Sequence, residues 1–154
     1  MDKKEIFDLL LQKITDIVEG NADSKEKLFK ICELLKENVP YYNWVGFYIA
    51  DNAKKELYLG PFVGEPTEHT KIPFGRGICG QAAARKETFV VQDVSKETNY
   101  LSCSVKVKSE IVVPVFKGDK VVAEIDIDSH RISPFTKEDQ EFLEQLAKII
   151  ENLF

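Results

Sequence analysis

The stretch SEIVVPVFKGDKVVAEIDIDS, residues 109–129, decides the fold. Two runs rich in β-branched residues are separated by Gly118-Asp119, a pattern that is typical of a β-hairpin with a tight turn. Side chains two residues apart lie on the same face of a strand. One face of this hairpin is therefore apolar and the other is acidic. The apolar side chains are Ile111, Val113, Val115, Ala123, Ile125 and Ile127, and the acidic ones are Glu110, Glu124, Asp126 and Asp128.

The segments on either side of the hairpin predict an α+β fold. Apolar residues at helical spacing predict a helix over 3–19, a second helix that begins at Asp23 or Ser24 and stops before Pro40, and a final helix capped by Thr136 and Asp139. Strands are expected at 43–50, 55–60 and 88–94, and a short helix within GRGICGQAAARK, 75–86. We expect a single domain over residues 1–154, with an antiparallel sheet whose N- and C-terminal helices pack on one face. The other face is left for solvent or for a ligand pocket.

Composition and charge exclude several classes of function. The net charge is −5 and the isoelectric point is about 5.2, so binding to nucleic acid or to an anionic membrane is not expected. No apolar run approaches the roughly 20 residues that span a bilayer, and MDKKEIFDLL does not resemble a signal peptide. We therefore expect a cytoplasmic protein. The three cysteines are an odd number and show no CxxC spacing, which argues against a disulfide framework and against a bound metal.

The acidic face of the hairpin has two interpretations. It can be a solvated surface whose charges oppose aggregation, or it can be a pocket for a cationic group whose clustered carboxyl groups retain a proton for acid catalysis. If Val45 and Phe47 face the helices, Trp44 and Tyr48 lie on the acidic side. Gly46 between them leaves room for a ligand to approach. The alternative is that the loop over 61–75 simply covers both rings.

The cysteines and histidines differ in their surroundings. Cys103 lies in the polar loop 95–106 and is a candidate reactive thiol, whereas Cys32 lies on an apolar helix stripe. Cys79 belongs to GRGICG, where a helix N-terminus can lower a thiol's pKa, although the small neighbouring residues favour a packing role. GRGICG does not match GxxxxGK[ST], so its signal for a phosphate-binding loop is weak. His69 and His130 have no partner at metal-ligand spacing, so we interpret both as ordinary surface histidines.

The order of five motifs resembles that of the free methionine-R-sulfoxide reductases, which are single GAF-domain proteins. The motifs are NWVGFY (43–48), GPF (60–62), IPFGRGICG (72–80), SEIVVPV (109–115) and IDIDS (125–129). The resemblance implies that Cys103 is the nucleophile of an oxidoreductase that counters oxidative stress. It also implies catalytic or substrate-binding roles for Glu110, Asp126 and Asp128, and a substrate pocket that includes Trp44 and Tyr48.

The resemblance further implies a thiol-dependent reaction. Cys103 would attack the sulfoxide sulfur, a carboxylic acid of the pocket would protonate the oxygen, and a sulfenic acid would result. Many family members carry a resolving cysteine at the position of His69. Because His69 replaces that cysteine here, Cys79, a small thiol or a thioredoxin-type protein would regenerate the enzyme. No bound cofactor is expected. Two rival interpretations are a stand-alone GAF sensor that binds a small molecule without catalysis and a scaffold that forms a homodimer through its helices.

Overall fold

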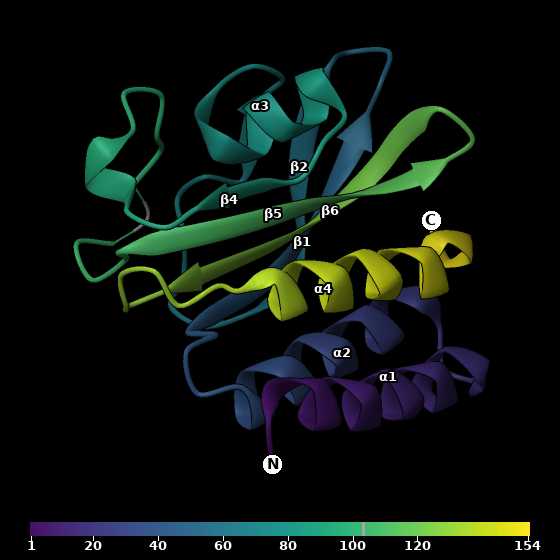
Figure 1. The fold of residues 1–154 in the computed structure, drawn as a ribbon. Coiled ribbons are helices and arrows are strands. Elements are labelled where there is room, and N and C mark those ends of the chain that lie inside the picture. Colours follow the sequence, from purple (N-terminus) through teal and green to yellow (C-terminus); the bar gives the residue numbers. More distant parts are fainter. Residues whose placement is uncertain (103) are drawn as a thin grey trace.

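The computed structural model describes residues 1–102 and 104–154, which form four α-helices and a six-stranded sheet (Figure 1). The helices are α1 (Lys3–Glu19), α2 (Ser24–Asn38), α3 (Gly77–Arg85) and α4 (Lys137–Ile149). The strands are β1 (Trp44–Asp51), β2 (Glu56–Val63), β3 (Lys71–Pro73), β4 (Phe89–Val91), β5 (Ser109–Lys117) and β6 (Lys120–Ser129), and short 3₁₀ turns lie at η1 (Val94–Lys96) and η2 (Glu151–Leu153). The predicted α+β class and antiparallel sheet are confirmed.

The sheet is built around the hairpin of β5 and β6. Its strand order is β3-β2-β1-β6-β5-β4, and all neighbours are antiparallel. In the hairpin Ile111 pairs with Ile127 and Glu110 pairs with Asp128, which confirms the predicted separation of the two faces. On its other side β6 pairs with β1. The hairpin therefore lies in the middle of the sheet.

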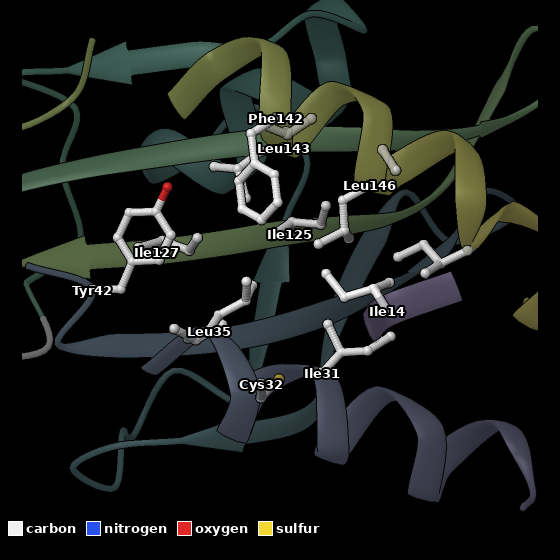
Figure 2. Packing of buried hydrophobic residues seen from close by; sticks show 14 of the residues in the cluster. Ile14, Ile31, Cys32, Leu35, Tyr42, Ile125, Ile127, Phe142, Leu143 and Leu146 are labelled. Atoms are coloured by element: carbon white, nitrogen blue, oxygen red, sulfur yellow. The ribbon is translucent and has the colours of Figure 1, made fainter. Parts of the chain in front are cut away.

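Helices α1, α2 and α4 lie on one side of the sheet, and α3 lies on the other (Figure 1). The apolar face of the hairpin packs against the first three helices in the main hydrophobic core. Figure 2 shows Ile125 and Ile127 beneath α4, facing Ile14 of α1 and Leu35 of α2. All four side chains are fully buried. Burial of each such side chain contributes about 1.5–3 kcal/mol, so this contact orients the sheet and leaves its acidic face toward α3.

Local sequence signals begin the long helices where they were predicted. Asp2 and Asp23 cap α1 and α2 by accepting hydrogen bonds from the amides of Glu5 and Glu26. Thr136 and Asp139 form the expected capping box at α4. Asp139 has a second structural role, since its buried carboxyl group also accepts hydrogen bonds from three side chains. The donors are Lys3 at 2.6 Å, Tyr41 at 2.7 Å and Tyr42 at 2.8 Å.

Two strands depart from the sequence prediction. β4 spans only Phe89–Val91 instead of 88–94, because the chain turns into η1 after it pairs with the N-terminal part of β5. β2 extends to Val63 because β1 continues to pair with it through Val45.

Among the described residues, no helix is both long enough and apolar enough to cross a membrane.

Candidate active site

The acidic side chains of the hairpin are buried, so the interpretation of a solvated face is wrong. Glu124 is fully buried, and Glu110, Asp126 and Asp128 are between 2% and 6% exposed. They are buried because α3 packs over β5 and β6 and carries a second hydrophobic cluster on this face. That cluster includes Ile78, Ala82 and Ala83 of α3.

Strand register brings the predicted site residues together. Along β6, Glu124 pairs with Tyr48 of β1, and Asp128 pairs with Trp44. On the other side of β6, Asp128 pairs with Glu110 of β5. Because side chains alternate between the two faces of each strand, this register places the acidic and aromatic side chains of β1, β5 and β6 on the same face of the sheet.

A small cavity lies above these carboxyl groups. Its walls come from the sheet, from α3 and from two loops, and they include Tyr48, His69, Cys79, Leu101, Glu110 and Asp126. The cavity has a volume of about 10 Å³, which is room for roughly one water molecule. Trp44 and Asp128 lie on the same face of the sheet but not on the cavity wall. The structure thus brings four of the seven predicted site residues to one cavity. Cys103 lies outside the described residues. Leu101, two residues before it in the chain, lines the wall.

Burial raises the pKa of three of the carboxyl groups. For Glu124 and Asp128 the raised pKa is due first to burial and then to the negative charge of Asp126. Burial also raises the pKa of Asp126. Glu110 forms hydrogen bonds with both Asp126 and Asp128. A hydrogen bond between two carboxyl groups requires a proton on one of them, so the cluster holds at least one proton at this face of the sheet.

Cys79 lies within this cluster as a neutral thiol. Its Sγ is 3.9 Å from Oε2 of Glu110. Burial, followed by the charges of Asp126, Glu110 and Glu124, raises the pKa of Cys79, so a helix N-terminus does not lower it and the favoured packing role agrees with the structure. In the described part of the chain, Cys79, Glu110 and Asp126 offer one group of three potential metal-ligand atoms within 4.8 Å of one another. Metal binding would require the thiolate, which burial opposes.

Trp44 and Tyr48 are covered by the loop that follows β2, as one of the two sequence interpretations expected. Trp44 stacks on Phe62 with ring centroids 5.4 Å apart, and its Nε1–H donates to the carbonyl of Glu65 at 2.9 Å. The expectation that Gly46 leaves room for a ligand is wrong. A Cβ at this position would lie 2.4 Å from the Trp44 ring, because the indole itself fills that space.

His69 is not an ordinary surface histidine. It is half-buried, it lines the cavity, and its Nε2 lies 2.8 Å from the carbonyl oxygen of Ser102. Its backbone carbonyl accepts a hydrogen bond from the Tyr48 hydroxyl at 2.8 Å. No local signal marks this role, since it depends on a contact between two loops. His130 is exposed, as predicted.

Residues 23–153 match the GAF domain sequence family. The chain belongs to the GAF domain family. A crystal structure of free methionine-R-sulfoxide reductase from Neisseria meningitidis, in complex with its substrate, superimposes with a TM-score of 0.94 at 39% identity, covering 100% of this chain and 91% of that one. Free methionine-R-sulfoxide reductases from Saccharomyces cerevisiae and Escherichia coli are 38% and 33% identical to it, covering 97% and 99% of this chain and 86% and 91% of their own lengths.

The glycines of GRGICG have a packing role in this GAF domain. Gly77 has a φ of +65°, and a Cβ there would lie 2.9 Å from Cγ of Leu101. Its amide donates to Oδ1 of Asn99 at 2.8 Å. Glycine is thus required where α3 meets the loop that carries Cys103. Arg76 and Leu101 also line the cavity and were not predicted as site residues.

Proposed function

We propose that this protein reduces free methionine-R-sulfoxide to methionine with electrons from thiols. The observation that carries the proposal is a cavity whose wall combines the buried Tyr48, Glu110 and Asp126 with Leu101, which precedes Cys103 by two residues. The similarity to reductases of this name, over nearly the whole chain, supports the same activity.

The cavity favours a free amino acid over a methionine residue within a protein. A free amino acid offers an ammonium group to Glu110, Asp126 and Asp128, and each charge-assisted hydrogen bond to a carboxylate contributes about 1.5–3 kcal/mol. Binding of the ammonium group stabilises carboxylates that are otherwise protonated because of burial. A methionine residue within a peptide has its α-nitrogen in an amide bond and therefore offers no ammonium group to these carboxylates.

The reaction uses one thiol and one proton donor. The Cys103 thiolate attacks the sulfoxide sulfur while a carboxylic acid of the cluster protonates the sulfoxide oxygen. That oxygen then transfers to the cysteine, so methionine leaves and Cys103 becomes a sulfenic acid. The sulfoxide is reduced by two electrons and the cysteine is oxidised by two. Glu110 is in position to share the proton, because it forms hydrogen bonds with both aspartates.

Regeneration consumes two further thiols. The first condenses with the sulfenic acid and releases water, and the second attacks the mixed disulfide and frees Cys103. The raised pKa of Cys79 makes this buried thiol a poor first partner. A small thiol or a thioredoxin-type protein is therefore proposed as the reductant, in a reducing compartment such as the cytoplasm. A homodimer is part of the proposal and is tested by the molar mass in solution.

The deciding experiment is an incubation with racemic free methionine sulfoxide and dithiothreitol, followed by chiral separation. We expect consumption of the R enantiomer, an equal yield of methionine and an unchanged S enantiomer. Cys103→Ser abolishes the reaction, whereas the matched Cys79→Ser retains it with dithiothreitol. N-acetylated methionine sulfoxide reacts more slowly, since it has no ammonium group. Binding of the free amino acid without turnover in the unmodified protein would favour the sensor interpretation instead.

A further inference from the structure

Two loops contribute to the wall of the cavity, and among their described residues a hydrogen bond and an ion pair join one loop to the other. The first loop follows β2 and the second precedes β5. Nε2 of His69 lies 2.8 Å from the carbonyl oxygen of Ser102, and Nζ of Lys106 lies 3.3 Å from Oε1 of Glu65. The second contact is an exposed ion pair, which contributes little to stability. The hydrogen bond of His69 is therefore the better defined of these two contacts.

The geometry fixes which atom donates in this hydrogen bond. A carbonyl oxygen only accepts, so Nε2 of His69 carries the hydrogen. The backbone of His69 is itself held in place, since its carbonyl accepts from Tyr48 on β1 and its amide donates to Oγ1 of Thr67 at 3.1 Å. A continuous path of hydrogen bonds thus leads from the sheet to the peptide group that joins Ser102 to Cys103.

The second loop is anchored at its other end by Asn99. Its Oδ1 accepts from the amide of Gly77, and its Nδ2 donates to the carbonyl of Gly75, both at 2.8 Å. Only a few residues separate this anchor from Ser102. The contact to His69 holds the segment that follows Asn99 at Ser102, the residue before Cys103.

From these contacts we propose that His69 is a positioning residue, which holds the Ser102 carbonyl, and with it the peptide group that leads to Cys103, during the reaction. This inference rests on the proposed function. A cavity of about 10 Å³ does not admit an amino acid, so part of its wall must move when substrate binds, while the hydrogen bond of His69 holds the backbone next to Cys103.

The test compares His69→Gln, whose side-chain amide can still donate, with His69→Phe, which keeps a ring but has no donor. We expect His69→Phe to lower kcat about two- to tenfold, the effect of losing one neutral hydrogen bond, without raising KM. His69→Gln should restore most of the rate. His130→Phe, at the other and exposed histidine, is the matched control and should leave both constants unchanged.

A second measurement does not require catalysis. The rate of alkylation of Cys103 by iodoacetamide, followed by mass spectrometry, should rise about two- to tenfold in His69→Phe and stay near the unmodified rate in His69→Gln. If the unmodified protein does not reduce methionine sulfoxide, the proposed function fails while this rate still tests the contact. Equal kinetics and labelling in His69→Phe and the unmodified protein would overturn the inference, as would equal losses in both variants. His69→Ala replaces His69→Phe if the latter does not fold.

Discussion

Glu124 makes a quantitative prediction about stability and pH. Its carboxyl group is fully buried between Tyr48 and Pro114 and lies next to the thiol of Cys79. Burial raises its pKa well above the ordinary value of 4.5. Because the folded state binds this proton more tightly than the unfolded chain does, the stabilisation is complete below pH 4.5 and is lost as the pH rises toward the folded pKa.

Substitution of Glu124 by Gln should remove this dependence. Within that pH window the unmodified protein loses up to about 1.4 kcal/mol of stability per pH unit because of Glu124, and the variant does not. The buried amide of the variant adds a cost of about 1–3 kcal/mol, which is the same at every pH. The free energy of unfolding of the variant relative to the unmodified protein should therefore rise with pH. Asp126 and Asp128 are present in both proteins, so their contributions largely cancel in the difference.

The assay is urea denaturation of both proteins at several pH values from about 5 to 8. Glu37→Gln, at an exposed position of α2, controls for the loss of one surface charge. A difference in the free energy of unfolding that stays constant over this range would refute the reasoning. It would mean that Glu124 ionises in the folded state much as it does in the unfolded chain.

Three further predictions concern other parts of the fold. Asp139→Ala should lower the free energy of unfolding by about 3 kcal/mol, because it leaves Lys3 and two tyrosine hydroxyls without their acceptor. In thermal unfolding, Tm should fall by about 6–12 °C, and an unchanged Tm would contradict the assigned hydrogen bonds. Gly77→Ala should lower the free energy of unfolding by about 1–3 kcal/mol in urea denaturation because of its positive φ, and a neutral effect would argue against the tight approach of Leu101 to Gly77. Cys32 and Cys79 should react with Ellman's reagent much more slowly in the native protein than in urea, since burial raises both pKa values; fast native labelling would contradict this.

Local patterns predicted the secondary structure and the two faces of the central hairpin. Alternation with a period of two separates Ile125 and Ile127 from Asp126 and Asp128 regardless of what packs on either side. Helix caps such as Asp23 are equally local, because the donor lies three residues away. These predictions hold because the interactions involved lie within a few residues of one another.

The sequence by itself determined that acidic and aromatic side chains share one face of the sheet. Only the tertiary structure decided that this face is buried, because burial depends on α3 and the loops that fold over it. Likewise, His69 meets Ser102 across 33 residues of sequence, and Trp44 fills the space above Gly46. Such contacts are set by how distant segments pack, and a single sequence carries no periodic or spacing signal for them.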